Sequence, residues 1–220
     1  MNIHRACCRI LVLSVVLSLI AVIPQGSFAQ AKKGVELFNA GNYQEAEKVF
    51  RDAMKADPSD TPSNYYLGLS ILLQKNYKDA LDILAKVKQS QDRASQRSRP
   101  EVPSEYQIQL ALARARIGLK QFEDAWKNLE SARKEDASSE VYVYRGFYYL
   151  EQEKHAEALK ELERAIKLDK KNPYAYYYSG IGNYHSGNAQ KAVEDLKMFL
   201  QLAPNAPEAP EAKAIIDKLC

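Results

Sequence analysis

The side chains that could carry out chemistry are few in this chain and stand far apart. His155 and His185 belong to different segments, and neither has a cysteine or carboxylate at the spacing of a metal ligand. Carboxylate pairs such as Glu161 and Glu163 are expected in solvent on polar helix faces, not in an enclosing cleft. No nucleophile stands beside a base, and no glycine-rich phosphate loop occurs. The sequence therefore predicts no catalytic, metal or cofactor site, and a protein that is not an enzyme.

The first 29 residues are predicted to be a secretory signal peptide. Two arginines open the segment, an apolar run occupies residues 10–23, and the small residue Ala29 stands before Gln30. The run is shorter than the ~20 residues that a spanning helix needs. We therefore expect cleavage before Gln30, no stable membrane insertion afterwards, and a periplasmic or secreted protein. A retained membrane anchor is the alternative.

Charge and cysteine content narrow the range of partners. Once the two arginines of the leader are set aside, the remaining basic residues nearly balance the 28 acidic ones. A balanced surface indicates neither a nucleic-acid partner nor an anionic membrane. Cys220 would be the only cysteine after cleavage, so no internal disulfide is possible. We expect a spectator thiol at the chain end, with a Cys220-linked dimer as the alternative.

A small residue stands twelve positions before an alanine five times along the chain. The five pairs are Gly34 and Ala46, Gly68 and Ala80, Ala113 and Ala125, Gly146 and Ala158, and Gly180 and Ala192. Successive alanines are 34, 45, 33 and 34 residues apart. A period near 34 indicates a stack of short units, each contacting only its neighbours.

Each unit contains two amphipathic runs joined by a short turn. Four residues after the alanine comes a large apolar residue, as at Phe50 and Leu84, and three residues later comes another apolar one. These offsets place all three side chains on one stripe of a helix. The earlier small residue lets the two helices of a unit approach closely.

This pattern resembles the tetratricopeptide repeat (TPR) family from about Gln30 to Pro204. The resemblance implies an all-α, right-handed superhelical solenoid of about five helix-turn-helix repeats. Three residues depart from the family pattern, because polar Arg116, Arg145 and Asn183 stand where apolar or aromatic residues are usual.

The expected organisation follows from the repeat boundaries. We predict a solenoid over residues 30–204, with repeats at about 30–60, 61–88, 104–137, 138–171 and 172–204. A polar insertion, residues 89–103, accounts for the one long interval. Residues 205–220 carry apolar side chains at helical spacing, and we expect a capping helix that covers the last repeat.

The resemblance also implies where a partner binds, because the first helix of each pair usually lines the concave groove in this family. The far end of that face is rich in tyrosine, a residue suited to interfaces. The alternative is that some of these tyrosines pack against the neighbouring repeat. The candidate partner-binding residues are Tyr65, Leu69, Arg114, Tyr144, Phe147, Tyr174, Tyr177, Tyr178 and Tyr184.

Export and repeat type together predict an interaction scaffold or adaptor in a cell-envelope or secretion complex. Its partner would be another protein or a peptide segment gripped in the groove. The basic set with which heat-shock co-chaperones of this family hold a terminal carboxylate is missing. A holdase-type periplasmic chaperone that uses the aromatic groove is the alternative.

Overall fold

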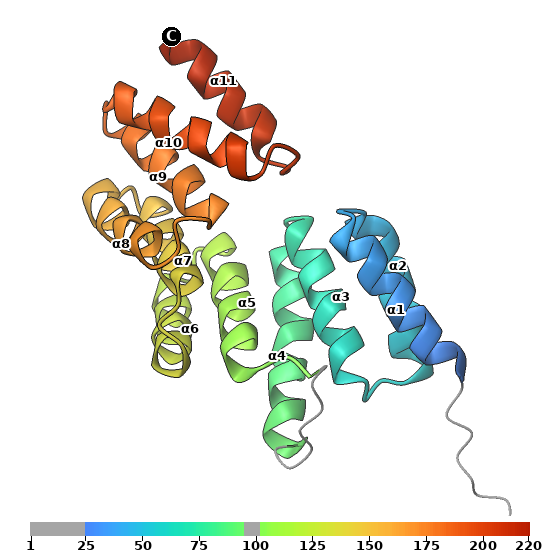
Figure 1. Ribbon diagram of the computed structural model, residues 1–220. Helices are drawn as coiled ribbons and strands as arrows, with labels where there is room; N and C mark the ends of the chain where they lie inside the picture. Colours follow the sequence, from blue (N-terminus) through green and yellow to red (C-terminus); the bar gives the residue numbers. More distant parts are fainter. Residues whose placement is uncertain (1–24, 95–101) are drawn as a thin grey trace, which may run out of the picture.

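The computed structural model describes residues 25–94 and 102–220 (Figure 1). The predicted leader up to residue 24 and residues 95–101 of the predicted insertion lie outside these ranges. The described chain forms eleven α-helices and no strand. Their bounds are α1 Gln25–Asn39, α2 Tyr43–Ala56, α3 Thr61–Leu73, α4 Tyr77–Ala94, α5 Glu105–Gly118, α6 Phe122–Glu135, α7 Ser139–Leu150, α8 His155–Leu168, α9 Pro173–His185, α10 Ala189–Leu202 and α11 Ala209–Leu219.

Helices α1 to α10 form antiparallel hairpins that stack in chain order, as the colours in Figure 1 show. Each helix contacts the next one along the chain, so every hairpin packs against its neighbour. The predicted all-α, right-handed superhelical solenoid is confirmed. In the parts of the chain described, no helix has both the length and the hydropathy of a membrane span.

The small residues of the repeat are required by the close approach of the two helices in a hairpin. A Cβ atom added to Gly146 would lie 2.5 Å from Cγ of Leu162, and one added to Gly180 would lie 2.6 Å from Cγ of Leu196. Such distances are far below van der Waals contact, so a larger residue would push the helices apart.

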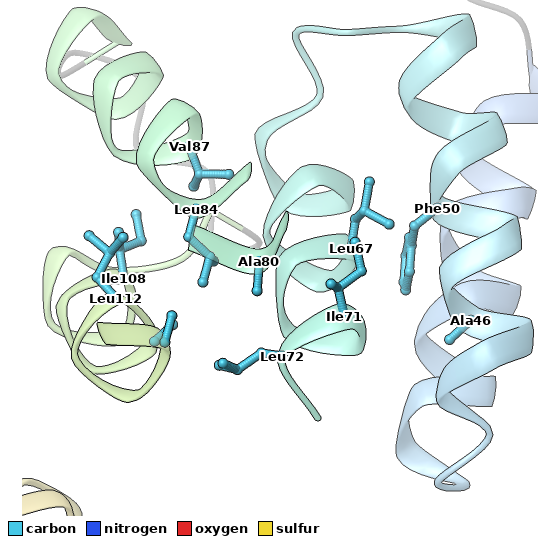
Figure 2. Packing of buried hydrophobic residues seen from close by; sticks show 12 residues of the cluster. Ala46, Phe50, Leu67, Ile71, Leu72, Ala80, Leu84, Val87, Ile108 and Leu112 are labelled. Atoms are coloured by element: carbon cyan, nitrogen blue, oxygen red, sulfur yellow. The ribbon is translucent and has the colours of Figure 1, made fainter. Parts of the chain in front are cut away.

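The N-terminal hairpins share one continuous apolar core. Figure 2 shows Phe50 from α2, Leu67 and Ile71 from α3, Leu84 from α4 and Ile108 from α5, all almost fully buried. These side chains link the first three hairpins. Burial of this apolar surface is the main favourable term that holds the stack together.

Helix α5 begins with a capping box directly after the insertion. The Ser104 side chain accepts a hydrogen bond from the backbone N–H of Gln107, and the Gln107 side chain accepts one from the backbone N–H of Ser104. The box satisfies two N–H groups that would otherwise lack partners. It fixes the point at which the solenoid resumes after α4, which extends to Ala94, beyond the predicted end of the second repeat.

Helix α11 continues the register of the repeat. It packs on α10 through buried Ala209 and Ala212. Its Glu208 and Glu211 accept hydrogen bonds from the hydroxyls of Tyr174 and Tyr177, each 34 residues earlier, at 3.3 and 2.9 Å. The helix thus occupies the place of a sixth first helix.

Candidate partner-binding groove

The first helices of the hairpins line the inner side of the superhelix. Helices α1, α3, α5, α7 and α9 contact one another in a row, whereas the second helices form no comparable row in the described chain. A stack that is tight on one side and open on the other curves towards the tight side. We call this inner side the concave groove.

Arg114 lies on the floor of the groove, surrounded by tyrosines. Its guanidinium lies close to the hydroxyls of Tyr144 and Tyr178. Burial disfavours the charged guanidinium, but Tyr144, Tyr178 and the carboxylate of Glu208 outweigh this effect and raise the pKa of Arg114. A permanently charged, partly exposed group, whose guanidinium carries N–H donors, is available to a bound segment.

An aromatic cluster continues from this floor towards the C-terminal end. The rings of Phe147 and Tyr178 lie 5.2 Å apart, and those of Tyr174 and Tyr178 lie 6.4 Å apart. Burial and the nearby Glu208 raise the pKa of Tyr174 to about 12. All three residues are only partly buried, so part of each side chain remains exposed.

Towards the N-terminal end, three tyrosines surround a carboxylate. The Tyr106 hydroxyl lies 2.5 Å from Oγ of Ser138 and donates to Glu140 at 3.3 Å. The Tyr65 hydroxyl donates to the carbonyl oxygen of Gln107 at 3.4 Å. Tyr65 and Tyr144 both lie close enough to Glu140 for its charge to raise their pKa values.

The structure brings together most of the predicted binding residues. Arg114 and Tyr144 lie at the centre of the groove, Tyr65 lies on one side of them, and Phe147, Tyr174 and Tyr178 lie on the other. Leu69 is partly buried and packs on the N-terminal core together with Tyr65.

Two predicted residues belong to the cap instead. Tyr177 is only 6 % exposed, because its ring packs on Phe199 and its hydroxyl donates to Glu211. The prediction that Tyr177 presents its side chain to a partner is therefore wrong for the free protein. Tyr184 accepts a hydrogen bond from the ammonium of Lys218 at 2.6 Å, so it too contacts α11.

Tyr106 and Glu140 were not among the predicted binding residues. Glu140 stands six residues before Gly146, and Gln107 and Tyr174 hold the same position before their own small residues. This shared register is the signal that could have identified Glu140 as a residue of the groove. Tyr106 stands one position earlier in its repeat.

Comparison with known proteins identifies the repeat. Two family models, both described as tetratricopeptide repeat, match residues 32–98 and 146–217. The chain belongs to the tetratricopeptide repeat family. Human tetratricopeptide repeat protein 13 is 26 % identical over 170 residues, which are 75 % of this chain and 18 % of that protein. The chain thus spans less than a fifth of the length of this curated relative.

Solved TPR structures share the fold at low sequence identity. TTC0263 of Thermus thermophilus superposes with a TM-score of 0.70 at 18 % identity, over 88 % of this chain and 98 % of that one. PilF of Pseudomonas aeruginosa gives 0.59 at 17 % identity, over 88 % of each chain. YrrB, described as a TPR protein with an unusual peptide-binding site, gives 0.50 at 19 % identity, over 86 % of this chain and 92 % of that one.

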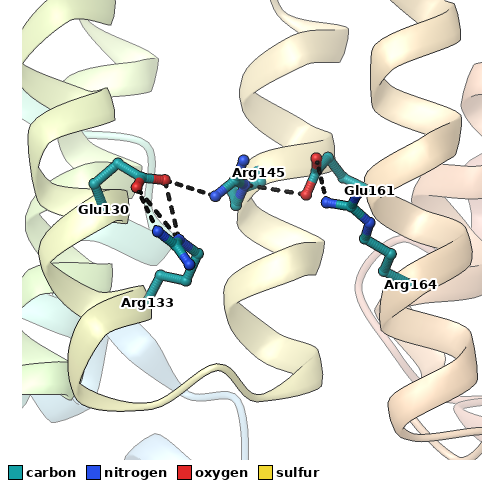
Figure 3. Close-up of polar contacts among 5 residues, drawn as sticks. All are labelled: Glu130, Arg133, Arg145, Glu161 and Arg164. Atoms are coloured by element: carbon teal, nitrogen blue, oxygen red, sulfur yellow. Dashed lines mark hydrogen bonds and ion pairs between the residues drawn. The ribbon is translucent and has the colours of Figure 1, made fainter.

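Away from the groove, the TPR stack carries a charged network that packs beside aromatic rings. The Arg145 side chain is 11 % exposed. It lies 2.6 Å from Glu130 and 3.0 Å from Glu161 (Figure 3). Its guanidinium carbon lies 4.6 Å from the centre of the Trp126 ring. The prediction that Glu161 is solvated is wrong, because it is buried between Arg145 and Arg164. A cavity of about 290 Å³ beside this network is lined by Trp126, Glu130, Arg133, Tyr142, Arg145 and Arg164.

The two TPR units at the C-terminal end also bring the histidines together. The rings of His155 and His185 stack with centroids 5.5 Å apart, although nothing in the sequence indicated that they meet. No group of three or more His, Cys, Asp or Glu side chains suited to a metal occurs in the residues that the structure describes. Two stacked imidazoles without a further ligand do not form a metal site.

Proposed function

We propose that this TPR protein is an exported scaffold or adaptor that binds a segment of another protein in its concave groove. The observation that carries the proposal is the row of partly exposed side chains from four successive first helices: Tyr65, Arg114, Tyr144 and Tyr178. TPR proteins bind other proteins or peptide segments, and YrrB is described as having a peptide-binding site.

The chemistry of this row suits peptide recognition. Tyrosine offers a large contact area with few rotatable bonds, and its hydroxyl can hydrogen-bond to a peptide backbone. Arg114 lies among Tyr144 and Tyr178, so its charged group can contact a bound segment together with these tyrosines. Tyrosine and arginine are also the residues that most often dominate interface energies.

The proposed setting is a cell-envelope or secretion complex. It depends on the leader predicted for residues 1–29, which would deliver the protein to the periplasm or outside the cell. Detection of the protein in a periplasmic or culture fraction, with Gln30 as its first residue, would support export. Recovery of the protein only from the cytoplasm would contradict it.

A photocrosslinking experiment tests the binding role. A photoreactive phenylalanine analogue placed at Tyr144 should give a discrete adduct, whereas the same group at the exposed Lys160 of α8 should not. Once the captured protein is purified, Arg114→Ala should weaken its binding by about tenfold or more. Equal crosslinking from both positions would overturn the proposed site.

The aromatic character of the groove also suits the alternative, a holdase-type chaperone. Accessible rings such as those of Phe147 and Tyr178 can hold many unfolded segments without a fixed sequence. Suppression of aggregation of several unrelated unfolded proteins, with no stable complex of fixed stoichiometry, would favour the chaperone over the scaffold.

A further inference from the structure

The charges in the groove do not cancel. Arg114 faces the carboxylate of Glu208, so these two charges offset each other. Glu140 has no such partner: no lysine or arginine forms an ion pair with it within residues 25–94 and 102–220. Its one hydrogen bond is from the neutral hydroxyl of Tyr106, at 3.3 Å.

The surroundings of Glu140 disfavour its charged form. Burial by the groove walls raises the pKa of Glu140, the hydrogen bond from Tyr106 opposes the rise, and the charge of nearby Asp136 adds to it. The side chain nevertheless remains exposed, so an approaching group can reach it. A carboxylate in this situation is stabilised when a cation arrives.

The neighbours of Glu140 favour a cation for a second, independent reason. Tyr65 comes from α3, Tyr106 from α5 and Tyr144 from α7, and each has Glu140 among its electrostatic neighbours. Aromatic rings attract ammonium and guanidinium groups through their negative faces. Three rings and one carboxylate, supplied by three successive TPR units, match the side chain of lysine or arginine.

An acidic segment would not fit this end of the groove. Its carboxylate would meet Glu140 and, further along, Glu208, although Arg114 beside Glu208 would offset part of this repulsion. An uncharged segment would leave Glu140 desolvated and still unpaired, which costs free energy. Charge complementarity therefore distinguishes between possible partners.

We propose that the segment bound in the groove carries a lysine or arginine whose charged group pairs with Glu140 among Tyr65, Tyr106 and Tyr144. This inference rests on the proposed binding function and specifies the chemistry of the partner. The remaining contacts, with Arg114 and the aromatic cluster at Phe147 and Tyr178, are available to the backbone and apolar side chains of the same segment.

A positional library of short synthetic peptides tests the proposal with the protein and three variants. In each sublibrary one position is fixed as Lys, Arg, Gln, Leu or Glu and the others are randomised. Bound peptides should be enriched in Lys or Arg at one position, and Glu140→Gln should reduce the affinity for these peptides by about tenfold. Glu140→Lys should reverse the preference towards Glu. Glu157→Gln, which removes an exposed carboxylate of α8, should behave as the unchanged protein.

The outcomes separate the inference from the function on which it rests. Peptide binding that shows no preference for a basic residue, or a preference that survives Glu140→Gln, would overturn the inference and leave groove binding intact. Binding of no peptide, together with no specific adduct from position 144, would overturn both. Circular dichroism of each variant confirms that the fold is retained.

Discussion

The two ends of the superhelix pack the helices of a hairpin with different kinds of side chain. In the second hairpin, Leu67 and Ile71 of the first helix face Ile83 of the second, and the seam between the helices is apolar. In the fifth hairpin the same register positions hold Ser179, Asn183 and Asp195. Asp195 is 1 % exposed and accepts hydrogen bonds from Ser179 and Asn183 at 2.7 and 3.1 Å.

The third and fourth hairpins belong with the polar end. Asn128 replaces the isoleucine of the second hairpin and hydrogen-bonds to Gln109 and Arg116, while Glu161 replaces it in the fourth and pairs with Arg145. The comparison teaches that the repeat fixes only the small residue and its leucine or phenylalanine. The seam beside them can be apolar or polar, provided that each polar group finds a partner.

The leucine that both ends share beside the small residue should give the largest effect on stability. Leu84→Ala and Leu162→Ala remove fully buried side chains at equivalent positions of the apolar and polar ends. Each should lower the free energy of unfolding by about 2–5 kcal/mol in urea denaturation, because each leaves a cavity beside a glycine. A large loss of stability in only one of the two variants would show that the leucine does not have the same role at both ends.

The polar contacts between the two helices of the fifth hairpin should give the next largest effect on stability. These contacts can be replaced by the apolar side chains of the second hairpin. Asp195→Ala leaves Ser179 and Asn183 without their acceptor and should cost about 1–3 kcal/mol in urea denaturation. The triple variant Ser179→Leu, Asn183→Ile, Asp195→Ile installs the seam of the second hairpin and should recover the loss. If the triple variant is less stable than Asp195→Ala, the two seams are not interchangeable.

The charged network of the fourth hairpin should respond more weakly. Arg145→Met removes the residue between Glu130 and Glu161, but Arg133 and Arg164 still pair with these carboxylates. We expect a loss of about 1–2 kcal/mol in thermal or urea unfolding, smaller than for a fully isolated buried pair.

The smallest effect concerns Glu140 and pH. Its pKa is raised on folding, so the native state binds a proton more tightly than the unfolded chain does. The resulting stability is present below the unfolded pKa of about 4.3 and is lost as the pH rises through the folded pKa. Glu140→Gln should therefore flatten the pH dependence of unfolding and add less than about 1 kcal/mol at neutral pH, since the carboxylate is exposed. A variant that is less stable than the parent at neutral pH would contradict this assignment.

Much of the fold could be predicted from the sequence because it depends on local spacing. The small residue, the alanine and the leucine recur at fixed offsets, and sterics alone then dictate a close hairpin. The groove was harder to predict, because whether a tyrosine faces solvent depends on what packs over it. Tyr177 and Tyr178 are adjacent in sequence, yet α11 covers only the first of them.

The polar networks could not be predicted from single positions. Arg145 and Asn183 look like departures from the family pattern until Glu161 and Asp195 are seen opposite them in their second helices. The signal is a pair of positions within one repeat, twelve or more residues apart, whose residues change together from one repeat to another. Glu140 was overlooked for a related reason, since its significance depends on which charged groups lie around it in three dimensions.

The position of α11 has a consequence for how the molecule behaves in a crowded solution. An apolar face at the end of a helical stack can bind a second copy of the protein. Repetition of this contact leads to head-to-tail fibres. Here the outward side of α11 presents Pro210, Lys213 and Asp217 to water. These exposed polar and charged residues reduce the apolar surface that this side of α11 offers to a second copy.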